Sequence, residues 1–404
     1  MKILYSAFEC NPSKGSDMYV GWSWAYHMSK INDVHVLTCT HNKADIEQYT
    51  RTNNVKATFH YLDVPLWLRK MPKHYFPQYI YWNYLAYKYA KRLHKKQKFD
   101  IVHLVSIADF RVVGWLWKLK DIKFIFGPVG GGQLTPKIFS PYVANHKFKE
   151  NLRKWINRIA ISLPIYKKGI HTASLTLISN DETIDFIQQY VGKDLQLKQV
   201  CELGIDRSYL DARANLVHKQ SGKIHILVSG RLKYRKGIAL LIHAISKMMT
   251  KSDFVVDIYG GGEEKYYLIK QVQELGIDNL VKFHGTVSFK DMQKIYQESD
   301  IYVLPSLRET TGTAVIEGMA NKLPVIALNQ NGVKYLVGKE CGILVPICYT
   351  LEETITEFAL ALDTLVENHD LRIKLGNNGY NRLVKNYTWD YKVLEFNNVY
   401  KSLL

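Results

Sequence analysis

Short apolar runs alternate with stretches of helical periodicity along the whole chain. The first series of strand-like runs lies at residues 2–6, 34–38, 57–62, 101–105, 123–126 and 175–179. The second series lies at residues 224–229, 254–259, 281–283, 301–304, 324–327 and 342–345, with amphipathic helices such as 237–250 and 263–275 between its strands. This alternation predicts parallel sheets covered by helices on both faces, and hence an α/β chain with two Rossmann-like domains.

The pattern breaks at residues 202–222, where the sequence becomes polar and irregular. We therefore expect a first domain at residues 1–205, a linker at 206–222 and a second domain at 223–385. We also expect a C-terminal helix at residues 386–404 that crosses back to the first domain. Ligands of open α/β sheets bind at the carboxyl ends of the strands, so two such domains predict a cleft between them.

The composition indicates a globular protein and suggests a reducing environment. A 47% hydrophobic fraction in 404 residues is enough for a core in each domain. No run approaches the roughly 18 apolar residues of a membrane-spanning helix. The five cysteines are widely spaced and contain no Cys-x-x-Cys, which favours a reducing cytoplasm over a disulfide framework or a zinc site.

The positive charge is concentrated in the first half of the chain. Residues 1–200 contain 29 Lys and Arg against 14 Asp and Glu, whereas the whole chain has a formal net charge of +17. The remaining residues are nearly neutral. This split suggests that one half faces an anionic surface or substrate and that the other does not.

Two cations follow the first strand of the second series. Arg231 comes just after the strand, and Lys236 and Gly237 begin the next helical pattern. An Arg fork and a Lys ammonium that converge near a helix N-terminus are suited to a diphosphate. The alternative is that both are ordinary solvated loop charges.

Two glutamates lie further along the second half. Glu309 and Glu317 are separated by seven residues, with Gly312 and Thr313 at the expected helix N-terminus between them. Free amides at a helix N-terminus favour a phosphate, and carboxylates accept hydrogen bonds from sugar and ribose hydroxyls. Solvated helix-end charges would explain either glutamate alone, but they explain the whole ordered set poorly.

Together with Gly260-Gly261-Gly262, Phe283-His284-Gly285 and Pro305-Ser306, these motifs resemble glycosyltransferase family 4, the group 1 glycosyltransferases, over residues 223–347. The resemblance implies the GT-B fold, with two Rossmann-like domains facing each other across a cleft. It implies that the first domain binds an acceptor and the second a nucleotide-diphosphate sugar, with a UDP-sugar favoured over a GDP-sugar. The donor-binding residues that it implies are Arg231, Lys236, Gly261, Gly285, Thr286, Glu309, Thr311, Gly312, Thr313 and Glu317.

The resemblance also implies roles and a reaction. Arg231 and Lys236 would hold the diphosphate, Glu309 would contact the transferred sugar, Glu317 would contact the ribose, and the main chain near Gly285 would meet the base. Transfer would retain the anomeric configuration through an oxocarbenium-like state, with Glu309, Arg231 and Lys236 as the catalytic set. Because the chain contains no Asp-x-Asp, we expect neither a bound metal nor another cofactor.

The acceptor half offers two glycine-rich segments after predicted strands. One contains Gly15, Ser16 and Asp17, and the other contains Gly130 and Gly131. Both resemble a subgroup of family 4 associated with bacterial surface polysaccharides, although these glycines could serve only to turn the chain. Many members carry a histidine just after the strand that runs into Gly127 here, and this sequence has none there.

Three polar residues near the strand at 101–105 are the nearest replacements for that histidine. They are His103, Asp109 and Arg111. A histidine inside an apolar strand is more often a core residue than a base, so we expect no base role for His103. The acceptor-side candidates are thus Gly15, Ser16, Asp17, His103, Asp109, Gly130 and Gly131.

Two basic stretches of the first half suggest a membrane surface. Residues 73–98 interleave aromatic side chains such as Tyr79 and Trp82 with basic ones that begin at Lys73 and His74, and residues 147–168 form a second basic stretch around Trp155. Helices of this composition can lie on anionic lipid, which predicts a cytoplasmic protein bound peripherally to the inner face of the cell membrane. The alternative is a solvated helix face whose tyrosines pack the core. No nucleic-acid module is present, and the two glutamates argue against that partner.

Two function classes therefore remain. The first is a retaining hexosyltransferase that acts on a lipid-linked or saccharide acceptor in bacterial cell-surface polysaccharide biosynthesis. The second is a non-catalytic nucleotide-sugar or anionic-lipid-binding protein on the same fold. The two glutamates and the two cations together favour the first class.

Overall fold

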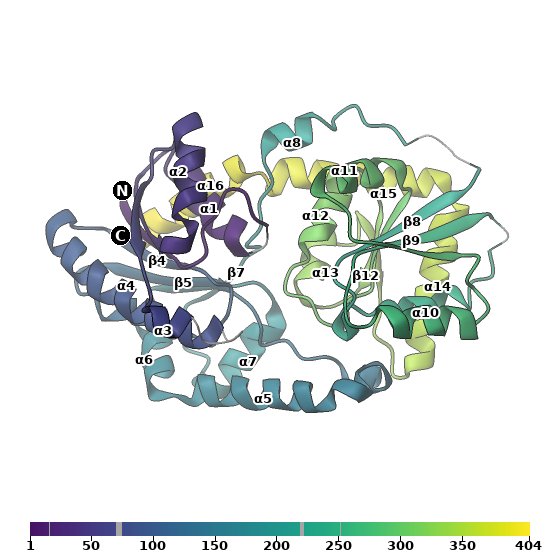
Figure 1. Cartoon of the computed structure of the whole chain (residues 1–404), viewed down its shortest axis with the longest axis horizontal. Helices are drawn as coiled ribbons and strands as arrows, with labels where there is room; N and C mark the ends of the chain where they lie inside the picture. The colour runs from purple at the N-terminus through teal and green to yellow at the C-terminus, as the bar shows by residue number, and fades with distance from the viewer. Residues whose placement is uncertain (16, 70–74, 219–221, 251) are drawn as a thin grey trace. The chain divides into compact units, whose positions relative to one another are not determined.

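The structure is a computed structural model that describes residues 1–15, 17–69, 75–218, 222–250 and 252–404. The chain divides into two units, and Figure 1 shows in each of them a sheet with helices packed around it. Unit 1 consists of Met1–Gly132, Arg153–Gly204 and Trp389–Leu404, and unit 2 consists of Gln133–Leu152 and Ile205–Thr388.

Unit 1 contains a seven-stranded parallel sheet of order β3-β2-β1-β4-β5-β6-β7. The strands are β1 (Lys2–Ala7), β2 (Asp33–Cys39), β3 (Thr58–Leu62), β4 (Ile101–Ser106), β5 (Lys123–Val129), β6 (Leu175–Ile178) and β7 (Leu197–Gln199). Its helices and short 3-10 turns are α1 (Asp17–Met28), η1 (Thr40–Asn42), α2 (Lys43–Thr52), α3 (Leu66–Arg69), α4 (Tyr75–Gln97), η2 (Leu116–Lys118), α6 (Pro164–Thr172), α7 (Asp181–Val191) and α16 (Trp389–Leu403). Strand β4 is buried at every position, as expected for a strand covered on both faces.

Unit 2 contains a six-stranded parallel sheet of order β10-β9-β8-β11-β12-β13. The strands are β8 (Ile224–Ser229), β9 (Phe254–Tyr259), β10 (Val281–Gly285), β11 (Ile301–Leu304), β12 (Val325–Leu328) and β13 (Gly342–Val345). Its helices and 3-10 turns are η3 (Lys137–His146), α8 (Arg207–Asp211), η4 (Tyr234–Lys236), α9 (Ile238–Ile245), α10 (Lys265–Glu274), α11 (Phe289–Glu298), α12 (Thr313–Ala320), α13 (Asn331–Val337), α14 (Leu351–Glu367) and α15 (His369–Asn386). The helix α5 (Lys147–Ser162) contains the boundary between the units, which falls between Leu152 and Arg153.

The strand orders locate a ligand site in each unit. The order reverses between β1 and β4 in unit 1, and between β8 and β11 in unit 2. Ligands of open parallel sheets bind at the carboxyl ends of the strands at such a switch point. Ligand sites are therefore expected at the segments that follow β1 and β4 and at those that follow β8 and β11.

The fold class predicted from the apolar pattern is confirmed. Every predicted strand is present with small shifts at its ends, and the three-residue edge strand β7 is the addition. Within the described ranges, no helix combines the length and the apolar character needed to cross a bilayer.

The division of the chain differs from the expected domain limits in two segments. We expect residues 133–152 in the first domain, but they pack with unit 2 because Phe139 and Val143 are buried in its core. The described part of the expected linker, including α8, also belongs to unit 2. The C-terminal helix α16 packs with unit 1, where the hydroxyl of Tyr400 lies 3.1 Å from that of Tyr5.

Candidate functional site

The loops that follow β8 and β11 come together at the switch point of unit 2. Gly237 explains how they approach so closely: its φ is +67°, and a Cβ atom there would lie 1.9 Å from the carbonyl oxygen of Pro305. The backbone amide of Leu307 also donates to the carbonyl of Arg235, at 2.9 Å. Glycine at position 237 therefore permits a contact that presents Lys236 to the segment carrying Glu309.

Glu309 has two cations and a serine hydroxyl around its carboxylate. It forms an ion pair with Lys236, accepts a hydrogen bond from Ser306 at 3.3 Å, and lies 3.9 Å from the guanidinium of Arg235. Burial alone would raise the pKa of Glu309, but Lys236 and Arg235 outweigh burial and leave this pKa below its ordinary value. Glu309 is therefore an ionised acceptor at neutral pH.

Glu317 lies on α12 in a different environment. The hydroxyl of Tyr296 donates to it at 2.9 Å and is itself 3.0 Å from the hydroxyl of Ser229, at the end of β8. Burial raises the pKa of Glu317, and the hydrogen bond from Tyr296 offsets this only in part. The two glutamates thus occupy distinct sites, one against cations and one against a tyrosine.

The start of α12 supplies backbone donors beside these carboxylates. The helix begins at Thr313, and its N-cap residue, Gly312, has a φ of +91° and provides no side-chain cap. Thr311 is buried, whereas Thr313 is exposed. An uncapped helix N-terminus is suited to an anion.

The glycine run after β9 packs against the loop that carries Arg231. A Cβ atom on Gly260 would lie 1.9 Å from the carbonyl of Gly230, and the amide of Leu232 donates to the carbonyl of Gly261 at 2.9 Å. The amide of Gly260 bonds the carbonyl of Gly285 at 2.7 Å.

The loops after β8, β9 and β10 therefore lie side by side. A Cβ on Gly261 would lie 3.2 Å from the hydroxyl of Thr286, which is next to Gly285 at the end of β10. The side chain of Arg231, in the loop after β8, is exposed to solvent.

A buried ion pair that the sequence did not reveal supports the Glu309 loop. The carboxylate of Glu150 accepts two hydrogen bonds from Arg308, at 2.8 and 2.9 Å, and one from the hydroxyl of Tyr234 at 2.6 Å. Both charged side chains are less than 10% exposed. The signal in the sequence was that Glu150 is the one acidic residue among the basic residues 147–168.

Residue Gln133 makes a further contact with this loop. Its amide group donates to the hydroxyl of Thr310 at 3.1 Å. Gln133, which belongs to unit 2, therefore supports the donor-side loop.

The acceptor-side candidates of unit 1 gather after β1, β4 and β5. Asp109 forms an isolated bridge with Gly130 and an ion pair with Arg111. Burial and the neighbouring carboxylates of Glu202, Asp109 and Glu9 raise the pKa of Asp17 to about 6. The structure thus brings Asp17 and Asp109 together in an acidic cluster.

Two other candidates lie beside this cluster. The carbonyl of Gly131 accepts hydrogen bonds from Arg153 and Asn157, the latter at 3.1 Å. Gly15 is exposed, with no heavy atom near a Cβ built on it. Ser16 lies outside the described residues.

His103 is a core residue of unit 1. It is fully buried, its Nδ1 lies 2.7 Å from the hydroxyl of Tyr400, and its Nε2 lies 2.5 Å from the carbonyl of Gly127. Burial lowers its pKa to about 3, so the ring is neutral. Both ring nitrogens are occupied, and we do not retain His103 as an acceptor-side residue.

The aromatic residues of α4 do not form the expected surface. Tyr79 and Trp82 are fully buried in the core of unit 1, and Tyr81 and Tyr87 pack against it. The lysines on the C-terminal half of the helix, such as Lys88, are exposed. The helix therefore packs its aromatic side inward, while Lys73 and His74 lie outside the described residues.

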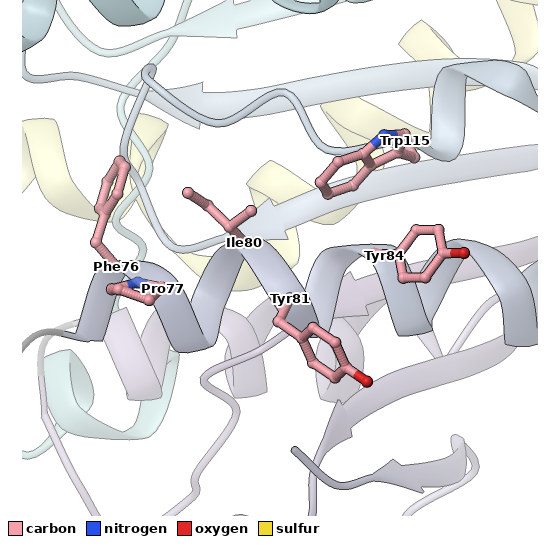
Figure 2. Close-up of a pocket in the computed structure, with 6 residues that line it drawn as sticks. All are labelled: Phe76, Pro77, Ile80, Tyr81, Tyr84 and Trp115. Carbon is pink, nitrogen blue, oxygen red and sulfur yellow. The ribbon is translucent and has the colours of Figure 1, made fainter. Parts of the chain in front are cut away.

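An apolar pocket of about 770 Å³ lies along the first half of α4 (Figure 2). Its lining residues are Phe76, Pro77, Ile80, Tyr81, Tyr84 and Trp115. The guanidinium of Arg111 lies 4.8 Å from the ring of Phe76, and the ammonium of Lys88 lies 4.7 Å from the ring of Tyr84. The pocket thus has a cation near each end, and Arg111 connects it to Asp109.

Among the residues that the structure describes, no group of three or more His, Cys, Asp or Glu side chains is placed to hold a metal ion. The expectation of metal-free chemistry stays a prediction.

Comparisons with known proteins agree with the arrangement of unit 2. The family model for glycosyl transferases group 1 matches residues 213–382. An uncharacterized glycosyltransferase of Methanocaldococcus jannaschii is 30% identical over 176 residues, which are 44% of this chain and 44% of that protein. The lipopolysaccharide core biosynthesis glycosyltransferase LpsE of Rhizobium meliloti is 26% identical over 187 residues, which are 46% of this chain and 50% of that protein. The match thus spans about half the length of these relatives.

One solved structure shows the same fold over the full length. HepE of Anabaena, in complex with UDP, aligns over 100% of both chains with a TM-score of 0.65 and 17% sequence identity.

Proposed function

The chain belongs to the group 1 glycosyltransferases through residues 213–382 and has the GT-B fold, and from this premise we propose that it transfers a hexose from a nucleotide-diphosphate sugar with retention of configuration. The observation that carries the proposal is the Lys236–Glu309 pair, which lies at the switch point of one sheet on the segment that leads into α12, with Arg231 in the same loop as Lys236. A UDP-sugar is favoured over a GDP-sugar, and the binding of UDP by HepE supports this choice.

Each donor-side residue has a role in this proposal. Arg231, Lys236 and the amides at the start of α12 stabilise the negative charge that develops on the departing diphosphate. Glu309, held ionised, accepts hydrogen bonds from the hydroxyls of the transferred sugar, and Glu317 accepts from the ribose. The loops at Gly261 and at Gly285 and Thr286 border the base.

The reaction exchanges one bond at the anomeric carbon for another. The bond between this carbon and the diphosphate oxygen breaks through an oxocarbenium-like state, and the acceptor oxygen forms a new bond on the same face. The proton of the acceptor hydroxyl passes to the leaving diphosphate. No protein nucleophile and no metal takes part.

Unit 1 binds the acceptor in this proposal, and a lipid-linked saccharide is favoured. The apolar pocket on α4 suits a hydrocarbon portion, and its neighbours Arg111 and Lys88 suit a phosphate. Asp109, paired to Arg111, and Asp17 suit saccharide hydroxyls. The similarity to LpsE supports a role in bacterial cell-surface polysaccharide biosynthesis.

The basic half of the chain supports peripheral contact with an anionic membrane, at the inner face of the cell membrane. Lipid-linked acceptors are presented at such a surface. The lysines of α4 and the basic residues 147–168 provide the charge.

A panel of nucleotide sugars tests the proposal. We expect one donor, a UDP-sugar, to raise the melting temperature and to be hydrolysed slowly without an acceptor. NMR of the product should show the donor's anomeric configuration, and excess chelator should leave the rate unchanged. Thermal stabilisation by a nucleotide sugar with no turnover on any lipid-linked or saccharide acceptor would favour a non-catalytic binding protein.

A further inference from the structure

Helix α5 exposes a row of large apolar side chains. Phe148, Leu152, Trp155 and Ile159 are 79%, 42%, 61% and 41% exposed, and Leu163, just beyond the helix, is 46% exposed. Their spacing of three or four residues puts them on one face of the helix. A row of this size is unusual on a surface that faces only water.

Polar contacts on the opposite face fix the orientation of the row. Glu150 and Asn157 are buried, and they bond Arg308 and the carbonyl of Gly131, respectively. Ile161 is also fully buried on this side. The helix therefore has no freedom to turn the apolar row inward.

The flanks of the row are basic. Lys147, Lys149, Arg153, Lys154 and Arg158 are the charged residues of the helix apart from Glu150, which is buried and paired. Lys149 makes an exposed contact of 3.7 Å with Glu263, and Arg153 bonds Gly131. In the described parts of the chain, no carboxylate pairs with Lys147, Lys154 or Arg158.

We propose that α5 is the membrane-docking element of this protein and lies in the plane of an anionic bilayer with Phe148, Leu152, Trp155 and Ile159 inserted among the lipids. An apolar face with cationic flanks is typical of a helix that lies in the membrane interface. Lys147, Lys154 and Arg158 pair with no carboxylate in the described parts of the chain, and this unneutralised charge favours an anionic surface over a neutral one. The inference rests on the proposed membrane contact, and it assigns that contact to α5 instead of to α4.

Flotation of the full chain with vesicles tests the assignment. We expect recovery with vesicles of phosphatidylcholine and phosphatidylglycerol, little recovery with phosphatidylcholine alone, and release by high salt. Trp155→Ser with Ile159→Ser should lower the bound fraction at least tenfold. The matched control is Tyr266→Ser with Leu360→Ser, which removes apolar side chains that are 86% and 58% exposed elsewhere. This control should bind as the wild type does.

The outcomes separate the assignment from the broader proposals. If the α5 variant keeps its fold by circular dichroism and floats as the wild type does, α5 is not the docking element. In that case, loss of flotation by the double variant Lys88→Gln with Lys91→Gln would assign membrane docking to α4. If the wild type does not float, the membrane contact itself is wrong, whereas glycosyl transfer to a soluble acceptor would be unaffected. A wild-type dimer that the α5 variant converts to a monomer would identify the row as a contact between copies and overturn the proposal.

Discussion

Lys236 and Glu309 form an ion pair between two loops of unit 2 that lie 73 residues apart in the sequence. The sequence suggested separate tasks for them, one on the diphosphate and one on the sugar. Their contact means that Lys236 helps to keep the pKa of Glu309 below its ordinary value. A substitution of Lys236 should therefore change the behaviour of Glu309 as well as the binding of phosphate.

Replacing Lys236 by alanine should lower kcat/KM at least about a hundredfold, because a group that stabilises the leaving diphosphate is lost. It should also move the acidic limb of the pH–rate profile to higher pH. Burial raises the pKa of Glu309, and without Lys236 the remaining cation is Arg235, at 3.9 Å.

The measurement is kcat/KM against pH for wild type, Lys236→Ala and the control Lys270→Ala, whose side chain is 74% exposed on α10. Lys270→Ala should match the wild type. A slower Lys236→Ala enzyme with an unshifted acidic limb would show that Lys236 acts on phosphate alone.

The two glutamates should respond differently to conversion to glutamine. Glu309→Gln should lower kcat by about a hundredfold or more, since Glu309 is proposed to meet the transferred sugar. Glu317→Gln should mainly raise the KM for the donor, by about tenfold, which corresponds to about 1.4 kcal/mol of binding. Tyr296→Phe should resemble a mild form of Glu317→Gln because it removes the 2.9 Å hydrogen bond. The opposite order of effects on kcat would exchange the roles of the two glutamates.

Replacing one partner of the buried Arg308–Glu150 pair should lower the free energy of unfolding strongly, whereas replacing both partners should lower it much less. Arg308→Met leaves a buried carboxylate without its cation and should destabilise the protein by about 3–5 kcal/mol. The double variant Arg308→Met with Glu150→Leu should recover most of this loss. Urea unfolding followed by circular dichroism gives both values.

The control for this pair is Lys294→Ala, which breaks an exposed pair with Glu298 and should cost about 1 kcal/mol or less. A double variant as unstable as Arg308→Met alone would mean that the pair itself contributes net stability.

Asp17 should make the folded protein less stable as the pH rises. Its pKa is about 6 in the folded chain against 3.8 for the free side chain, so the folded state binds the proton more tightly. The free energy of unfolding therefore falls between about pH 4 and pH 6 through this group. Asp17→Asn should match the wild type near pH 4 and exceed its stability at pH 7.

Asp45→Asn provides a control of opposite sign. Asn11 and Lys14 lower the pKa of Asp45, so its charge stabilises the fold above its ordinary pKa, and Asp45→Asn should lose stability at pH 7. The urea midpoints of Asp17→Asn, Asp45→Asn and the wild type, measured near pH 4 and at pH 7, test both expectations. Equal midpoints for Asp17→Asn and wild type at pH 7 would contradict the raised pKa.

The sequence predicted the sheets well because strands buried on both faces leave uninterrupted apolar runs. Strands β8, β9, β11 and β13 begin and end at the predicted residues. The donor-side motifs could also be placed from the sequence, because each lies at or shortly after the end of a strand of unit 2, while the roles of their residues stay predictions. Gly237 illustrates why: its left-handed backbone conformation favours glycine at that one position.

Other features depend on partners far away in the chain. The pattern of α4 could not tell whether Tyr79 and Trp82 face solvent or the core, because aromatic residues suit both. The residues around Phe139 have no local signal for unit 2, whose core they complete. The pairing of Glu150 with Arg308 joins residues 158 positions apart, and only the fold reveals it.

Each unit is built from segments that are separated in the sequence, and this affects the order in which the units can fold during synthesis. Tyr400, which is made after every strand of unit 1, bonds both His103 and Tyr5 inside that unit. Phe139 is buried in unit 2, although it is made long before the strands around it. Neither unit has its full core when the ribosome has finished only that unit's first segment. Unit 1 must wait, with its C-terminal helix missing, until residues 389–404 emerge. Unit 1 therefore cannot complete its fold before unit 2 has been made, although N-terminal domains usually fold first, and removal of residues 389–404 should expose apolar surface of unit 1.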